Sequence, residues 1–434
     1  MSSVRAFVAA RKVIFTILAF GGVAESTLAT NGLNLIGFGA ESIGMGGADV
    51  AVARDTSALN VNPAGLSQIV TRRFDSTVGA AFALNVRHKD PLGNDVATEN
   101  SPIPGANFGY AHRLGAVPMT LGIGSFVQGG AGFEYSNLAT AFGTRDDLKS
   151  TLGILQLTPG LGYQVTDDFS LGLTLLGTYA MIDQEVFPNT SFRDPADASR
   201  TFFGSSLDDM SAIGFAVKLG ALYRANEWLK LGIAYTTEAD LDFDGGELVS
   251  NMNAVGMGRV TYRDVTLQGL GTPRELVLGV AIQPTARLLI ALDLSWLNWA
   301  NAVSDTTLIA RNPDNPSAPP ELIVSSRPNW RDQFVVAVGG AYEVTANGAI
   351  RLGYNYGRDP THPATLDPLL ASISEHHFTA GAGYRFSAHW RVDGAVEYRV
   401  NKKVIYTNPD LPFGPDAAAQ NESVAIFATI SRIW

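Results

Sequence analysis

Asp240, Asp242 and Asp244 are spaced two apart, as carboxylates are at the start of a calcium-binding loop. Such a loop needs a glutamate at its twelfth position, where this chain has Asn251. Residues two apart in a strand share one face, so the three carboxylates are expected to line a solvated strand face. We predict no metal site from this cluster.

His376 and His377 could hold a metal only if both side chains pointed the same way. Neighbouring strand residues point to opposite faces, so this pair cannot readily chelate one ion. A serine hydrolase needs a serine, a histidine and a third orienting group, and no such spacing is evident among the six histidines. We predict no catalytic residues, no metal and no cofactor, and therefore no enzyme. A third interpretation, beside the two functions considered below, is an enzyme or an adhesin built on a β-barrel.

The composition excludes other classes of protein. Hydrophobic residues make up 46% of the 434-residue chain and charged residues only 17%, which excludes intrinsic disorder. A net charge of −10 argues against a nucleic-acid partner. The absence of cysteine excludes disulfides and thiol chemistry.

The N-terminus predicts export. Arg5, Arg11 and Lys12 precede an apolar stretch at 13–23, and small residues suit a cleavage site before Thr30. Residues 1–29 are therefore predicted to be a signal peptide. No apolar run of 18 residues follows, so no transmembrane helix is expected. An exported, apolar, glycine-rich chain without such helices indicates an outer-membrane β-barrel.

The connections between apolar, alternating segments set the strand number. Short polar turns lie near 112–118, 163–169, 223–228, 283–287, 342–348 and 384–390. Longer connections lie near 89–104, 136–150, 187–209, 245–272, 304–329, 360–374 and 407–420. Thirteen connections join fourteen strands, an even number, as a closed barrel requires. We predict an all-β, 14-stranded antiparallel transmembrane β-barrel over residues 71–434.

Aromatic residues fit the two membrane interfaces. Tryptophans are expected to form girdles at the short-turn end (Trp228, Trp390 and Trp434) and near the opposite end (Trp296, Trp299 and Trp330). The alternating segment 424–434 ends the chain on an aromatic residue, as a terminal barrel strand does, although Arg432 interrupts the pattern.

Residues 30–70 do not read as a lipid-facing strand, because they are rich in glycine and small residues. A barrel of fourteen strands encloses a lumen too wide for its own side chains to fill. We therefore predict that residues 30–70 form a hatch, or plug, inside the lumen.

Several motifs resemble one family of proteins. The stretch 37–48, Asn62-Pro63-Ala64-Gly65-Leu66, the tryptophans of 296–299, the segment 329–332 and the run ending at Trp390 resemble the FadL/TodX (OmpP1) family of outer-membrane transporters. The resemblance covers the mature chain, and the Asn-Pro-Ala block is its most specific part.

The resemblance implies a function and a route. It implies passive uptake of long-chain fatty acids or other hydrophobic molecules, with lateral release through an inward kink of the third strand. It also implies that Asn62, Pro63 and Ala64 are hatch or gate residues near this kink. Glycines favour bends and bulges in strands, so the kink is expected at Gly129, Gly130 and Gly132.

The expected partners are hydrophobic small molecules, hydrocarbons among them, and the lipid and lipopolysaccharide of the bacterial outer membrane, with the chain as a monomer. If the ligand is an acid, Lys218, Arg263 and Arg385 are candidate basic contacts. The alternative is a general polar porin with a charged constriction loop at 187–209, which carries Arg193, Asp194, Asp197 and Arg200.

Overall fold

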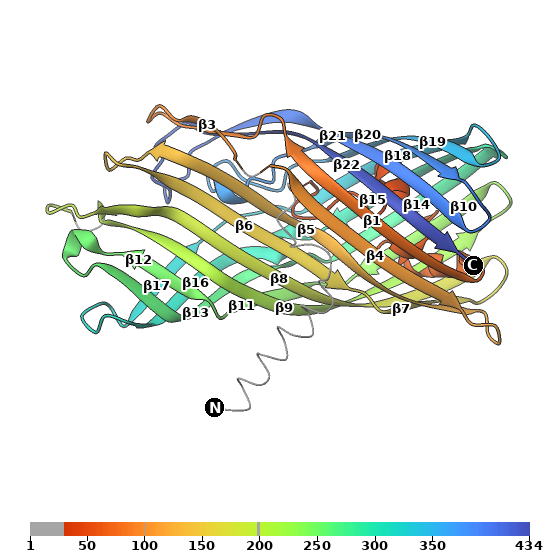
Figure 1. Cartoon of the computed structure of the whole chain (residues 1–434), viewed down its shortest axis with the longest axis horizontal. Coiled ribbons are helices and arrows are strands. Elements are labelled where there is room, and N and C mark those ends of the chain that lie inside the picture. The colour runs from red at the N-terminus through yellow and green to blue at the C-terminus, as the bar shows by residue number, and fades with distance from the viewer. Residues whose placement is uncertain (1–29, 100, 198–199) are drawn as a thin grey trace.

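The protein is a closed antiparallel β-barrel with an internal plug. The computed structural model describes residues 30–99, 101–197 and 200–434, so the predicted signal peptide lies outside the described residues. The first strand, β1 (Arg72–Ala83), pairs with the last, β22 (Ala417–Ile433), which closes the sheet (Figure 1). No helix in the described ranges is long and apolar enough to cross a membrane.

Counted over the described residues, the strand segments combine into the fourteen predicted barrel strands. Between β1 and β22 they are β4 (Ile103–Arg113), β5 (Met119–Ala139), β6 (Arg145–Leu157) with β7 (Gly160–Gln164), β8 (Phe169–Phe192), β9 (Phe202–Arg224), β10 (Leu229–Thr236) with β11 (Ala239–Asp244) and β12 (Glu247–Asn251), β13 (Arg259–Thr272) with β14 (Glu275–Thr285), β15 (Leu288–Leu297) with β16 (Val303–Pro313), β17 (Glu321–Ser326) with β18 (Gln333–Glu343), β19 (Gly348–Gly357), β20 (His376–Arg385) and β21 (Trp390–Tyr406). A further hairpin of β2 (Arg87–Lys89) and β3 (Asp95–Ala97) pairs with β22. Short helical turns are α3 (Trp299–Ala302), η4 (Asn253–Val255) and η5 (Pro368–Leu370).

The strands present large apolar side chains outward. Phe215 is 77% exposed, Leu352 69% and Phe334 68%, while the residues between them on the strands face the lumen. A soluble protein would not leave so many such side chains in water, and a barrel in lipid must do so. The alternation confirms the predicted fold class.

The strands at the long-loop end run further than the sequence suggested. The predicted loop 245–272 is mostly strand, because β12 and β13 continue through it and pair with each other. Their inner faces pack into one apolar cluster with Met252, Val260 and Tyr262, so ladder bonds and burial both favour extended backbone there. Figure 1 shows this extension around β12, β13, β16 and β17.

Two predicted girdle tryptophans are buried instead. Trp299 is 1% and Trp330 7% exposed, and their rings pack edge-to-face with centroids 5.5 Å apart. The strand direction breaks at α3, between β15 and β16, and this break turns Trp299 inward. The indole then covers Gly32, where a Cβ would lie 2.3 Å from the ring.

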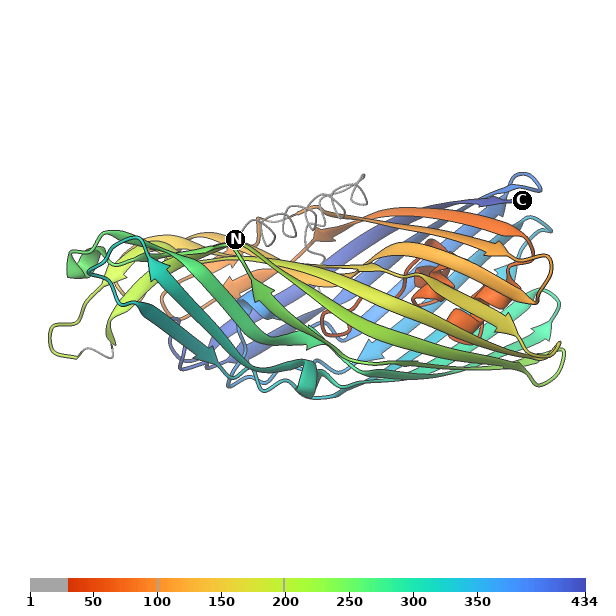
Figure 2. The ribbon, with the colours of Figure 1, turned by 90° about the horizontal axis from the view of Figure 1, so that it is seen from below.

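The hatch lies in the lumen, in the half of the barrel nearer the short turns and the C-terminus (Figure 2). It contains α2 (Ala40–Gly44), η1 (Thr56–Leu59) and η2 (Pro63–Gln68). Most of its apolar side chains are buried, and Ile43, Leu59 and Leu66 are at most 1% exposed.

Wall glycines let the hatch backbone approach the strands closely. A Cβ on Gly172 would lie 2.1 Å from Ala64 N, and one on Gly353 would lie 2.2 Å from Gly46 N. Gly232, Gly279 and Gly339 face other hatch residues in the same way. Much of the glycine content therefore serves contact between wall and plug.

Candidate functional site

Within the described residues, the hatch fills a break in strand pairing between β4 and β5. These strands pair only from Phe108–Ser125 to Arg113–Thr120. Above this ladder, residues 103–107 of β4 still pair with β1, and β5 still pairs with β6, but no β4–β5 ladder bond continues in the described residues. We call the region between residues 103–107 and 126–133 the β4–β5 gap. Along β4 it is about 15 Å long at a strand rise of about 3.3 Å per residue.

The hatch takes the place of β4 at this gap. Leu35 N–H donates to the carbonyl of Gln128 at 3.1 Å, and Gly130 N–H donates to the carbonyl of Leu33 at 3.1 Å. Asn34 and Gly129 form the bridge between these two bonds. The otherwise unpaired edge of β5 is thus satisfied by the plug rather than by the neighbouring strand.

The predicted kink glycines differ from one another. The β5–β6 register shifts between Val127 and Gly129, which is a bulge. A Cβ on Gly129 would lie 1.7 Å from Leu33 O, and Gly130 has φ of +151°, where a Cβ would lie 2.1 Å from Leu152 O. Gly132 pairs regularly with Thr151. The backbone therefore requires glycine at 129 and 130, and their part in release remains a proposal.

Two amide side chains tie the edges of the gap together. Val127 N–H donates to Asn107 Oδ1 at 2.8 Å, directly above the last β4–β5 ladder pair. Asn60 of the hatch donates through Nδ2 to Gln128 Oε1 at 2.9 Å. At the other end of the gap, Glu99 N–H donates to Glu134 O at 2.9 Å.

A small cavity of about 20 Å³ lies behind the gap. Leu35, Ile103 and Val127 give it apolar walls, and Phe427 of β22 closes another side. The polar side chains on it include Asn107 and Arg399. A space of this size holds about one water molecule, so the gap is closed in this conformation.

The Asn-Pro-Ala block packs on a different part of the wall. Asn62 Nδ2 donates to Val50 O at 2.8 Å and to Ala221 O at 3.1 Å, while its Oδ1 caps η2 at Ala64 N. Pro63 and Ala64 lie against Gly172 of β8. The block fixes the hatch to β8 and β9, and Asn60, two residues before it, bonds to Gln128 of β5.

Charged residues hold the other side of the hatch. Glu41 lies 3.5 Å from Arg351 Nη2 and 3.3 Å from Arg391 Nη2, and it accepts from Arg54. Burial opposes its ionisation, but the three guanidinium groups outweigh burial and hold the pKa of Glu41 well below its usual range.

A buried acidic pair fixes the middle of the hatch. Asp293 Oδ2 accepts from Asp49 N at 2.8 Å and from Val50 N at 2.9 Å. Burial, and then the neighbouring Asp293, raise the pKa of the Asp49 carboxyl well above its usual value.

The three predicted basic contacts are spread over the barrel. Lys218 is buried in the lumen and pairs with Glu275 at 3.4 Å, Arg263 pairs with Glu247 near the rim, and Arg385 is exposed at a short turn. None of them lines the cavity behind the gap, whereas Arg399 does. Arg399, Asn107 and Leu35 were not predicted as site residues. The alternation of β21 could have placed Arg399 in the lumen.

The charges of the 187–209 segment do not line the lumen. Arg193, Asp197 and Arg200 are exposed, and Arg200 pairs with Asp194 at 3.4 Å. Asp240 and Asp242 are exposed on β11, and the described residues contain no group of three or more ligating acids and histidines.

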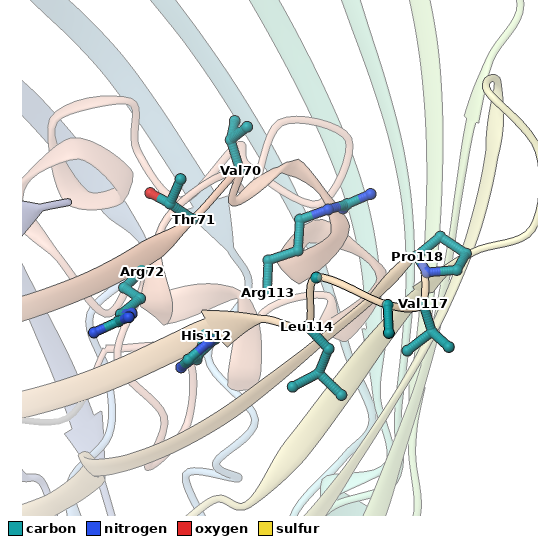
Figure 3. A pocket seen from close by; sticks show the side chains of 10 residues that line it. Val70, Thr71, Arg72, His112, Arg113, Leu114, Val117 and Pro118 are labelled. Carbon is teal, nitrogen blue, oxygen red and sulfur yellow. The ribbon is translucent and has the colours of Figure 1, made fainter.

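A wider groove of about 590 Å³ opens at the short-turn end, between residues 70–72 and 112–118. Figure 3 shows Arg72 and His112 on one side of it, while Arg113 extends away from them and donates to Ser67 O and Gln164 Oε1 at 3.1 Å. This groove is open and half polar, and it lies below the β4–β5 gap, which remains the candidate site.

Comparisons with known proteins identify the family to which the chain belongs. The family described as outer membrane protein transport protein (OMPP1/FadL/TodX) matches residues 23–431. Outer membrane protein P1 of Haemophilus influenzae is 25% identical over 433 residues, covering 90% of this chain and 89% of that protein.

Solved structures show the same fold. The toluene transporter TodX of Pseudomonas putida is similar with a TM-score of 0.77 and 21% identity, over 92% of this chain and 99% of that one. A FadL homologue of Pseudomonas aeruginosa has a TM-score of 0.72 and 19% identity, over 93% and 99%. The chain therefore belongs to the OMPP1/FadL/TodX family of outer-membrane transport proteins.

Proposed function

We propose that this protein takes up long-chain fatty acids or other hydrophobic molecules passively and releases them sideways into the membrane through the β4–β5 gap. The observation that carries the proposal is the replacement of β4 by hatch residues Leu33–Leu35 along β5. A wall held shut by a few hydrogen bonds to a plug can open without unfolding the barrel.

The surroundings of the gap suit an apolar cargo. Outside it the barrel meets lipid, and inside it Leu35, Val127 and Phe427 line the cavity. An apolar molecule that leaves here stays in an apolar medium, so it does not pay the cost of entering water. The direction of transport then follows the concentration gradient.

The extracellular half offers an apolar entrance region. Trp299, Trp330, Leu369 and Ile373 belong to one buried cluster that also reaches Leu33 of the hatch. Apolar contacts therefore continue from the extracellular loops to the residue that pairs with β5. Relatives in this family include transporters of toluene, which supports a hydrophobic substrate.

A general polar porin is the second candidate, and the structure favours it less. A porin needs an open, water-filled lumen, whereas residues 30–70 occupy this lumen and Arg193, Asp197 and Arg200 are exposed to solvent. Planar-bilayer recordings separate the two functions. We expect little ion conductance from the purified protein, and steady conductance of small ions would favour the porin.

Uptake measurements test the proposal directly. Cells that lack the gene should take up radiolabelled palmitate or hexadecane slowly, and expression of the protein should raise the rate at least tenfold. Uptake of glucose serves as the polar control. Unchanged uptake of both hydrophobic probes would refute the proposed function.

A further inference from the structure

A row of polar side chains crosses the inner wall of the barrel beside the β4–β5 gap. His377 of β20, Arg399 of β21 and Ser423 of β22 are direct cross-strand partners, and each is at most 1% exposed. Glu397 joins them on the same face of β21, also 1% exposed. Burying this many polar groups beside an apolar route costs free energy unless each group finds a hydrogen-bond partner.

The hydrogen bonds define where the proton of His377 lies. His377 Nδ1 is 2.9 Å from Glu397 Oε1, and Arg399 Nε donates to the same oxygen at 3.0 Å. An ionised carboxylate only accepts, so Nδ1 must carry the proton. The other ring nitrogen, Nε2, is then a bare acceptor whenever the imidazole is neutral.

Several polar atoms of this wall are left without a partner. Among the described residues, none bonds to His377 Nε2, to Ser423 Oγ, or to either amide atom of Asn421. Asn421 is 1% exposed and lies on the same face of β22, two residues beyond Ser423. Buried groups of this kind normally find partners, so their absence points to a ligand.

This wall meets the candidate exit. Arg399 lines the cavity behind the gap, together with apolar Leu35, Ala81 and Phe427. A ligand in the gap would therefore have an apolar tail among these residues and a polar end at the row of His377, Arg399 and Ser423.

We propose that this row binds the carboxyl group of an aliphatic carboxylic acid together with one proton, so that the protein is selective for long-chain acids over neutral hydrocarbons. The inference rests on the proposed function and names its substrate class. Asn421 and Ser423 supply hydrogen bonds to the carboxyl oxygens, and His377 Nε2 shares the proton with the acid.

Charge balance requires the proton. Arg399 and Glu397 already neutralise each other, so a carboxylate that entered alone would be an uncompensated charge in a buried site. When the proton enters as well, the ligand and His377 together carry no net charge. The proton resides either on the acid or on His377 Nε2, and no other bond changes.

Other charges on the neighbouring elements are paired among themselves. Toward the extracellular end, Lys402 pairs with Glu375 at 2.8 Å and also with Asp359. Toward the periplasm, Arg351 pairs with Asp393 at 3.0 Å and with Glu41 of α2, and Arg391 joins the same group. On β19, the residue opposite His377 is the uncharged Asn355.

Binding of decanoate and of methyl decanoate to the full folded protein tests the proposal, because the two probes share a tail. Between pH 7 and pH 9 free decanoate is ionised, so uptake of one proton lowers its affinity about tenfold per pH unit. The ester should bind with the same affinity at every pH. Titration calorimetry of decanoate in two buffers of different ionisation enthalpy should report about one proton taken up.

Variants assign the effect to this row. His377→Asn keeps a donor toward Glu397 but removes the acceptor Nε2, so it should weaken decanoate binding at least fivefold and leave binding of the ester unchanged. Ser423→Ala leaves the ion pair of Arg399 and Glu397 intact. It should lower the affinity for decanoate at least fivefold and leave the affinity for the ester unchanged. His376→Asn is the matched control, since His376 lies on the opposite face, 2.7 Å from Tyr354 Oη. Comparison with this control variant also cancels any pH-dependent partitioning of decanoate into the detergent micelles that hold the protein.

The outcomes separate the two proposals. If decanoate and the ester bind equally and without pH dependence, the acid site is refuted and hydrophobic transport stands. If decanoate binds to His377→Asn as tightly as to His376→Asn, the carboxyl group is bound elsewhere and the assignment fails. If neither probe binds, the proposed function itself is refuted.

Discussion

The N–H of Leu35 in the hatch donates to the carbonyl of Gln128 on β5 at 3.1 Å. This bond joins the plug to a barrel strand at the place where that strand has lost its neighbour. A movement of the hatch and an opening of the wall are therefore coupled, because Leu35 cannot leave without exposing the edge of β5.

Asn107 should keep the gap closed. Its Oδ1 accepts from Val127 N–H, which has no strand partner on that side. We expect Asn107→Ala to speed amide hydrogen exchange in peptides covering 126–132 about fivefold, since one net hydrogen bond contributes about 1 kcal/mol. Peptides from the continuous β8–β9 ladder are the internal control. Unchanged exchange at 126–132 would show that Asn107 does not restrain the gap.

Gly129 should be required for the contact between hatch and β5. An alanine Cβ there would lie 1.7 Å from Leu33 O, so Gly129→Ala must displace residues 33–35. We expect faster proteolysis of the hatch in the folded barrel. Gly115→Ala, at a turn where a Cβ meets nothing within 4 Å, should behave as wild type. Equal proteolysis of the two variants would contradict this account.

A disulfide should lock the gate. The chain has no cysteine, and residues that face each other across antiparallel strands have Cα atoms about 5.5 Å apart, which suits a disulfide. The double variant Leu35→Cys, Gln128→Cys should lose at least nine-tenths of hydrophobic uptake when oxidised and recover it when reduced. The two single variants control for each substitution. Full activity of the oxidised protein would mean that the hatch does not leave β5 during transport.

Acid should loosen the hatch through Glu41. Its folded pKa is held well below the unfolded value of about 4.3, so the stabilisation is complete above that value and is lost as the pH falls through the folded pKa. Glu41→Gln should remove about 1–3 kcal/mol from hatch docking at pH 7. Hydrogen exchange of residues 37–47 measures this. The variant should show a weaker pH dependence than wild type, and an identical dependence would assign the effect to another group.

The sequence predicted the barrel well because alternation and turn chemistry are local. The alternation of apolar residues within 288–296 is enough to identify the lipid-facing side of that strand. Each short turn likewise identifies a hairpin from a few neighbouring residues. The kink expected at Gly129, Gly130 and Gly132 stays a prediction, and the structure has a register shift between Val127 and Gly129 of β5.

The contacts at the gap could not be read in this way, because they join residues far apart in the chain. That Leu35 meets Gln128, and that Arg399 lies between His377 and Ser423, follows only once the strand register is known. The prediction that Trp299 and Trp330 lie in an aromatic girdle was wrong for a related reason. Nothing local shows that α3 turns Trp299 onto Gly32, which lies on the hatch.

The most direct test of lateral release is to block the β4–β5 gap with a large side chain introduced on β4. Gly105 lines the cavity, and a Cβ there would meet only Val127 at 4.0 Å, so Gly105→Trp places an indole in the opening. Gly115→Trp puts the same side chain in an exposed turn as the control. With equal amounts of folded barrel, we predict that Gly105→Trp loses at least nine-tenths of hydrophobic uptake and Gly115→Trp loses none. Undiminished uptake by Gly105→Trp would contradict release through the β4–β5 gap.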